Sequence, residues 1–223
     1  MPKKAGMEKW KKKRRQEYLE AKEYQYYIFC EGEQTEPKYF EGFKKLIENN
    51  PIYKDMILIE IEPCAAETMR VITAKLNTKN MDIQYHVAWS NECIEFWFIL
   101  HFANYISNNH RTEYIRFLND KFSELKIGKY QKNMDNIFEI LMNQGNPKLA
   151  SRYAKKIIKE NNCMSNANIA PGTKVFKLVE ELARYLPEEI RGKFIFSGIL
   201  HRHIALSRLR IWQKSAGLLP TGC

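Results

Sequence analysis

The chain has 223 residues, 44% hydrophobic and 28% charged, which is ordinary for a soluble globular protein. Its net charge of +10 favours an anionic partner, with nucleic acid ahead of a membrane surface. A basic surface that contacts only solvent would have the same net charge. The longest apolar run, residues 94–103, is too short to span a bilayer, so no membrane partner is expected. The five scattered cysteines have no zinc spacing and indicate reduced thiols in a cytoplasmic protein.

The first 24 residues form a basic N-terminal arm with few apolar positions. Its densest run of charge consists of Lys11, Lys12, Lys13, Arg14 and Arg15. Such a run is either a frayed, solvated extension or an arm that contacts nucleic-acid phosphates without sequence preference. The sequence leaves both interpretations open.

A strand, a polar loop and a helix follow the arm. Residues 26–30 are aromatic and β-branched, which predicts a buried strand. The loop from Glu31 to Pro37 leads into apolar residues at helical spacing, and Pro37 suits the first turn of that helix. Thr35 is expected to cap the helix. This unit predicts the opening of an α/β domain.

The rest of the chain predicts a small parallel sheet followed by helices. Further strands are expected at residues 56–61 and 84–89, with a helix at 67–76 between them. Residues 92–105, capped by Ser90 and Asn91, are apolar almost all round and predict a buried helix. Further helices are expected at 112–125, 134–142, 147–160, 173–185 and 188–214. The expected parts are an arm (1–24), an α/β core (25–108) and a mostly helical C-terminal region (109–223).

The acidic loop after the first strand is the first candidate site. Glu31, Glu33 and Glu36 lie where an open parallel sheet binds its ligands, beyond the carboxyl end of a strand. Carboxylates there can hold Mg²⁺, which can then bind a phosphate. Acidic residues near a helix start also interact favourably with the helix dipole, so a purely structural role stays open.

Glu95 is the second candidate, because large apolar residues surround it in the sequence. A buried carboxylate is costly unless it is paired, protonated or bound to a metal, so Glu95 is either a catalytic group or part of an exposed helix edge. His101, later in the same helix, is expected to be a core residue. His201, Arg202 and His203 have no acidic partner nearby in sequence and indicate a basic face.

Three segments resemble the RloB-like family of phage-defence proteins. Residues 28–40 (IFCEGEQTEPKYF) resemble its opening CEGExTExxYF motif, and residues 88–102 (AWSNECIEFWFILHF) resemble its AxSNxxFExWxLLHF motif. Residues 172–180 (GTKVFKLVE) are similar to a weaker C-terminal block. The first two motifs are long and specific.

The resemblance implies a Toprim-like α/β fold and a metal-dependent nuclease active in antiviral defence or abortive infection. In that fold a Glu after the first strand, here Glu31, binds Mg²⁺ together with an Asp-x-Asp pair on a later strand. Mn²⁺ is an alternative to Mg²⁺. With either metal, Glu33, Glu36 or Glu95 would assist Glu31, and Lys38 would hold phosphate. The implied substrates are RNA, including tRNA, or DNA. The implied partner is an ATPase of the AAA or ABC type.

The chain departs from the family pattern between the two long motifs. Residues 62–87 contain a single Asp, Asp82, and no Asp-x-Asp pair, so the chain resembles a shortened member. Two alternatives to a nuclease follow. The chain could be an inactive module that binds nucleic acid or the ATPase, or an unstable product of a deletion.

Overall fold

The computed structural model describes residues 24–63, 83–195 and 208–213. Its centre is a four-stranded sheet in the order β2-β1-β6-β3, with every neighbouring pair parallel. The strands are β1 (Tyr24–Cys30), β2 (Ile57–Pro63), β3 (Ile83–Val87) and β6 (Arg208–Gln213). The prediction of an α/β fold with a small parallel sheet and helices around it is therefore confirmed.

The strands expected at 26–30, 56–61 and 84–89 form with shifted ends. The helix expected over 188–214 is wrong: α9 covers only Glu188–Arg191, and Arg208–Gln213 form strand β6 between β1 and β3. The sequence of β6, RLRIWQ, begins with alternating polar and apolar residues, and this period of two suits a strand. Pairing on both sides satisfies the backbone groups of this segment.

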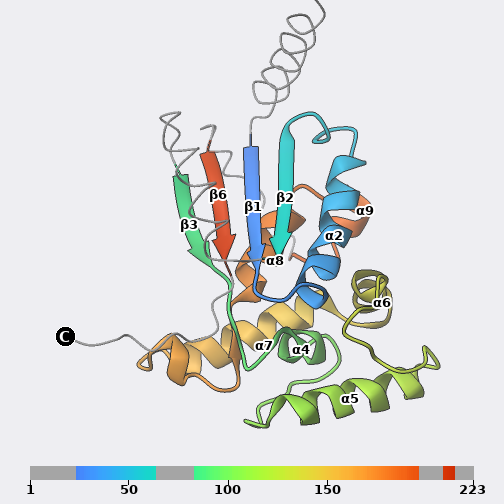
Figure 1. The fold of residues 1–223 in the computed structure, drawn as a ribbon, viewed down its shortest axis with the longest axis vertical. Helices are drawn as coiled ribbons and strands as arrows, with labels where there is room; N and C mark the ends of the chain where they lie inside the picture. The colour runs from blue at the N-terminus through green and yellow to red at the C-terminus, as the bar shows by residue number, and fades with distance from the viewer. Residues whose placement is uncertain (1–23, 64–82, 196–207, 214–223) are drawn as a thin grey trace, which may run out of the picture.

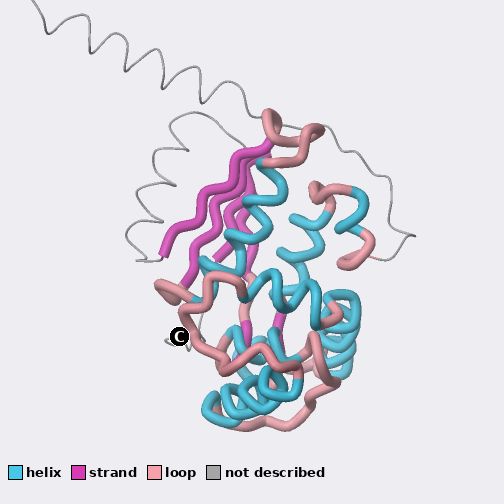
Figure 2. The backbone as a smooth tube through the Cα atoms, turned by 90° about the vertical axis from the view of Figure 1, so that its right-hand side faces the viewer, coloured by secondary structure: helices cyan, strands magenta, loops and turns pink. Residues whose placement is uncertain are grey.

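Helices α2 (Thr35–Glu48), α8 (Val175–Ala183) and α9 flank the sheet, and the other helices lie beyond the carboxyl ends of the strands (Figure 1). Figure 2 shows the same division from the side, with the strands in the upper part and most helices below. The lower helices are α4 (Ile94–Ile99), α5 (Arg111–Glu124), α6 (Ile137–Gln144) and α7 (Pro147–Glu160). A short antiparallel pair, β4 (Ser90–Asn91) with β5 (Gly172–Thr173), and a 3-10 turn, η1 (Asn166–Asn168), complete the described elements.

The apolar helix after β4 is buried, as predicted, but it is shorter than the expected 92–105. All six residues of α4 are buried, and Phe96, Trp97 and Phe98 are fully enclosed. The chain turns away after Leu100, where the carbonyl of His101 accepts a hydrogen bond from the amide of Asn146 at 2.8 Å. Neither Ser90 nor Asn91 caps α4, since Cys93 is the N-cap and makes no side-chain cap bond.

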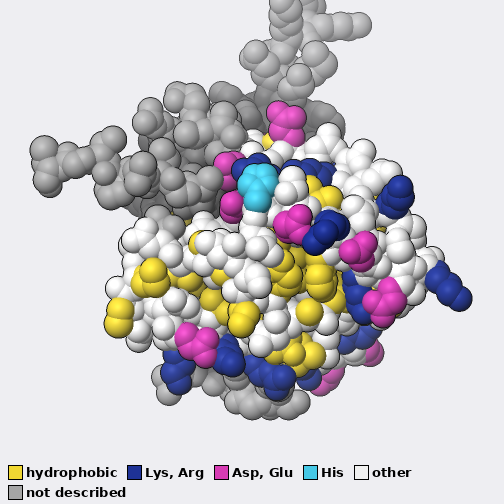
Figure 3. All heavy atoms as spheres, turned by 90° about the horizontal axis from the view of Figure 1, so that it is seen from below, with side chains coloured by type: hydrophobic (Ala, Val, Ile, Leu, Met, Phe, Trp, Pro, Cys, Tyr) yellow, Lys and Arg dark blue, Asp and Glu magenta, His cyan; other side chains and the backbone are white. Residues whose placement is uncertain are grey.

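Figure 3 shows the molecule from below, where hydrophobic side chains occupy the middle of the face and charged side chains lie around them. No helix among the described residues is long and apolar enough to cross a membrane. The basic arm, the helix expected at 67–76 and the segment from His201 to His203 lie outside the described residues.

Candidate functional site

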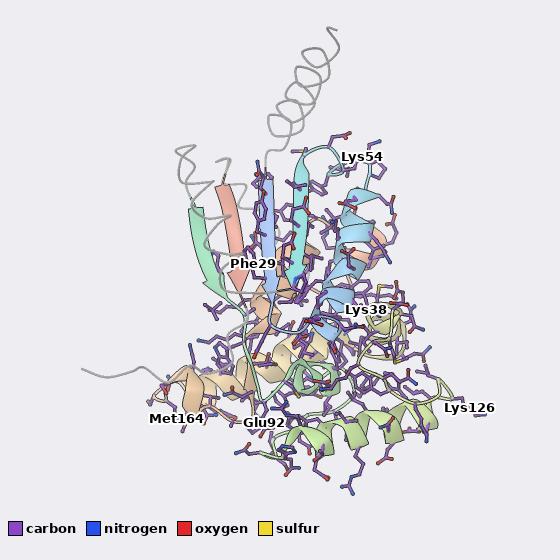
Figure 4. All side chains as sticks on the ribbon, in the orientation of Figure 1. Phe29, Lys38, Lys54, Glu92, Lys126 and Met164 are labelled. Atoms are coloured by element: carbon purple, nitrogen blue, oxygen red, sulfur yellow. The ribbon has the colours of Figure 1, made fainter. Side chains whose placement is uncertain are left out.

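The acidic loop lies at the carboxyl edge of the sheet, as predicted. Cys30 ends β1 opposite Pro63, the last residue of β2, and the loop then leads into α2. In Figure 4, Phe29 lies toward this end of β1, and Lys38 lies on the end of α2 that the loop enters. The side chains of Glu31 and Glu33 are exposed, so both carboxylates are open to a ligand from solvent.

Glu36 differs from the other two acidic residues because its side chain is buried, with only 6% exposed. It lies in the first turn of α2, and its carboxylate folds against the backbone of Gly32. A Cβ at position 32 would be 2.2 Å from Oε2 of Glu36, so only glycine leaves room for the carboxylate in this place. Glu36 therefore faces the interior while Glu31 and Glu33 face solvent.

Glu95 is buried in α4 with 2% of its surface exposed, and it has partners. Its Oε1 accepts a hydrogen bond from the hydroxyl of Tyr130 at 3.0 Å, and Nζ of Lys132 lies 4.0 Å from the same oxygen. Both partners come from the segment between α5 and α6. Glu95 is therefore a buried carboxylate paired with a phenol and a lysine, and the alternative of an exposed helix edge is wrong.

Tyr130 is the hydrogen-bond donor to Glu95. Burial raises the pKa of the Tyr130 phenol, and the charge and hydrogen bond of Glu95 raise this pKa further. Electrostatic interactions with Cys93 and Glu36 make smaller contributions in the same direction. The hydroxyl of Tyr130 therefore stays neutral and donates its hydrogen bond to the buried carboxylate of Glu95.

The segment carrying Tyr130 is tied to the start of α2. The hydroxyl of Thr35 donates to the carbonyl of Lys132 at 2.8 Å, so Thr35 binds this segment instead of capping its helix, and the predicted cap is wrong. Nζ of Lys38 donates to the carbonyl of Asn133 and lies 2.8 Å from Oδ1 of Asp135. This lysine holds the pKa of the exposed Asp135 carboxyl below its usual range, mainly through the hydrogen bond.

The described residues do not make up the magnesium site that the resemblance implies. Among residues 24–63, 83–195 and 208–213, no three His, Cys, Asp or Glu side chains lie close enough together to hold a metal ion. Glu31 and Glu33 face solvent, whereas Glu36 and Glu95 lie in the interior. The metal and catalytic roles of these four residues stay predictions, as do the phosphate contacts of Lys38.

Comparison with known proteins identifies the family. A family model described as RloB-like protein matches residues 62–182, more than half of the chain. This chain belongs to the RloB-like family. The match includes the segments at 88–102 and 172–180 that resemble the family, whereas the acidic loop at 31–37 precedes it. No curated protein and no solved structure matches the chain significantly.

Sequence reasoning missed the segment between α5 and α6 in this RloB-like chain. Tyr130 is 5% exposed although polar residues surround it in the sequence Gly-Lys-Tyr-Gln-Lys. An isolated aromatic residue in a polar connection is a signal that the connection packs onto the core. Its partner Glu95 lies 35 positions away, so no local pattern could pair the two.

We expect Tyr130→Phe to lower the free energy of unfolding by about 1–3 kcal/mol, because it leaves a buried carboxylate without its hydroxyl donor. Urea denaturation at neutral pH measures this loss. Tyr53→Phe is the matched control, since Tyr53 is half-buried, its ring contacts that of Tyr185, and its hydroxyl makes no hydrogen bond within the described residues. Equal stability of the two variants would show that the Tyr130 hydroxyl does not support Glu95.

Proposed function

We propose that this RloB-like chain is an antiphage defence protein that acts on phosphodiester bonds of RNA or DNA. The observation that carries the proposal is the exposed Glu31–Gln34 loop at the carboxyl edge of a parallel sheet. Ligands of open α/β sheets bind outside this edge. Glu31 directly follows the inner strand β1, and Lys38 supplies a nearby cation.

The metal is a separate part of the proposal. Mg²⁺ or Mn²⁺ is the cofactor that the Toprim-like resemblance implies, and Glu31 is its proposed ligand in the described region. One carboxylate does not complete such a site, because Mg²⁺ needs further carboxylates or substrate oxygens beside its waters. Glu95 is proposed as a positioning residue, since its contacts with Tyr130 and Lys132 tie α4 to the segment that Thr35 and Lys38 also bind.

The test is cleavage of labelled tRNA and plasmid DNA by the purified chain with Mg²⁺, with Mn²⁺ and with EDTA. We expect cleavage that needs the metal and falls by at least about 100-fold in Glu31→Ala, because electrostatic stabilisation of the transition state is lost. Glu189→Ala is the control, since Glu189 is an exposed carboxylate on α9. Cleavage by Glu31→Ala at the parent rate would refute the assignment.

A second function is favoured by the lack of a three-ligand metal group in the part of the chain that the structure describes. In this alternative the chain binds nucleic acid or a partner ATPase of the AAA or ABC type and cuts nothing. It predicts salt-sensitive nucleic-acid binding without cleavage under any metal. Binding that does not weaken with salt would contradict the nucleic-acid form of this alternative.

A further inference from the structure

Helix α7 carries a row of cations along one face. Five of its 14 residues are Lys or Arg: Lys148, Arg152, Lys155, Lys156 and Lys159. At 100° per residue these positions fall within a sector of about 100°, and from the first to the last they span about 16 Å of helix. All but Lys148, which is half-buried, are exposed. The row therefore faces solvent over most of the length of the helix.

The opposite face of α7 is fixed in the core. Its buried residues include Ala150, Ser151, Ala154 and Ile157, and α7 packs against α4, α8 and β5. Small side chains on this face allow α4 to approach closely, and burial of this face leaves the cationic face toward solvent. The N-terminus of the helix is capped: Pro147 occupies its first turn, and the side chain of Asn146 accepts a hydrogen bond from the amide of Leu149. The cations are thus held on a rigid element.

Two more cations, Lys174 and Lys177, lie at the start of α8, the helix that packs against α7. Residues 147–177 contain seven Lys or Arg, the last two being Lys174 and Lys177, against one acidic residue, Glu160. Partial burial lowers the pKa of Lys174, and the nearby charge of Lys177 lowers it further, so these two ammonium groups repel each other. Like charges gathered with few carboxylates to neutralise them indicate a site for an anion outside the chain.

The acidic residues around α7 neutralise only part of the row. Lys155 lies 2.6 Å from Glu180, and Lys156 lies 3.8 Å from Glu160. Both are surface pairs, which stabilise a fold little and can be exchanged for another anion. The Arg152 guanidinium lies over the ring of Tyr153, 5.7 Å from its centre. Within the described residues no carboxylate pairs with Arg152, Lys159 or Lys177.

We propose that the α7 face, with Lys174 and Lys177, binds the phosphate backbone of a nucleic acid. Along the axis of a duplex, a length of about 16 Å covers about five base-pair steps at 3.4 Å each, so several phosphates lie within reach of the row. The inference rests on the proposed function for the class of ligand and adds where that ligand is held. It assigns no cleavage to α7.

Two other anionic partners suit this face less well. A helix that binds a membrane surface inserts an exposed apolar face, whereas the apolar face of α7 is buried in the core. Protein interfaces are built around a desolvated apolar centre that is depleted of lysine. The exposed sector of α7 is instead dominated by lysine, which suits a regular array of phosphates.

The test compares two triple variants that remove the same charge. Arg152→Gln, Lys159→Gln and Lys177→Gln neutralise the proposed face, and Lys45→Gln, Lys126→Gln and Lys193→Gln neutralise exposed cations elsewhere. Fluorescence anisotropy measures binding of a labelled single-stranded RNA and of a DNA duplex over a range of salt. Circular dichroism and thermal melting are expected to show the same folded state in both triples.

We expect the α7 triple to bind at least about tenfold more weakly at moderate salt, and the control triple to bind as the parent does. A plot of log affinity against log salt has a negative slope. In the α7 triple this slope should be shallower than in the parent, by about 2 for the single strand and about 3 for the duplex. Equal losses in both triples, or no loss in the α7 triple, would overturn the proposal. Selective loss of binding to phosphatidylserine vesicles or to polyglutamate, with nucleic-acid binding unchanged, would overturn it too.

The result is independent of the cleavage test. If Glu31→Ala abolishes cleavage while the α7 triple binds normally, the inference fails and the proposed nuclease stands. If the α7 triple loses binding and the parent chain cleaves nothing with either metal, the inference stands and the nuclease fails.

Discussion

Gly42→Ala is expected to destabilise the chain by about 1–3 kcal/mol, although alanine is normally the better residue inside a helix. Gly42 lies in α2 where this helix packs against α6. A Cβ at position 42 would be 2.1 Å from Cγ and 2.5 Å from Cβ of Phe138. Rotating the Phe138 side chain moves its ring but not its Cβ, so relief requires the two helices to move apart.

Such a movement would disturb the aromatic core around Phe138. Its ring lies 4.8 Å from that of Phe43 and 6.2 Å from that of Phe194, centre to centre. Urea denaturation should show a lower midpoint with an unchanged slope, because the surface exposed on unfolding stays the same. Gly42→Ala therefore tests how closely α2 and α6 pack.

Gly192→Ala is the matched control. Gly192 follows α9 with helical backbone angles, and a Cβ there would meet nothing within 4 Å. We expect the free energy of unfolding to stay the same or to rise by up to about 1 kcal/mol, because alanine restricts the conformations of the unfolded chain. A Gly42→Ala protein as stable as Gly192→Ala would show that α2 and α6 lie farther apart than the structure places them.

Local patterns predicted most of the fold because most of its elements are specified locally. The strand–loop–helix unit at 24–48 combines a largely aromatic, buried run with helical spacing. Helix α7 follows its predicted bounds because Asn146 and Pro147 mark its start. The end of the chain was predicted wrongly. Strand β6 forms by pairing with β1 and β3, more than a hundred residues earlier, and no local signal specifies those partners.

The candidate site was predictable in position but not in geometry. The loop after β1 lies at the sheet edge because parallel strands all end there. Glu31 and Glu36 are only five positions apart, yet one faces solvent and the other is buried against Gly32, since α2 turns its first residues inward. The partner of Glu95 was not predictable, because Tyr130 reaches it from a segment beyond α5.

The chain should lose stability when the pH falls from 6.5 toward 4, and His101 should cause much of the loss. Burial lowers the pKa of His101 from 6.5 to about 4, although hydrogen bonds with the backbone of Trp97 and Phe98 oppose the shift. The ring is 3% exposed, and its Nε2 has no partner among the described atoms. Protonation in the folded state would place an unpaired charge in the apolar core.

The direction and size of the effect follow from this depressed pKa. Between pH 6.5 and pH 4 the unfolded chain binds a proton at His101 and the folded chain does not, so stability is complete above 6.5 and falls as the pH decreases through this window. The shift corresponds to a loss of about 3 kcal/mol. Urea denaturation at several pH values gives the free energy of unfolding at each.

Two variants separate His101 from the other groups that titrate in this range. His101→Leu should flatten the pH dependence by about 3 kcal/mol between pH 6.5 and 4, whatever its stability at neutral pH, because the titrating ring is gone. His110→Asn is the control at an exposed histidine, where asparagine can replace the imidazole as the N-cap of α5; it leaves the buried His101 in place, so the loss of about 3 kcal/mol assigned to His101 should remain. If His101→Leu follows the parent curve, the imidazole is not held neutral by burial and its pocket admits water.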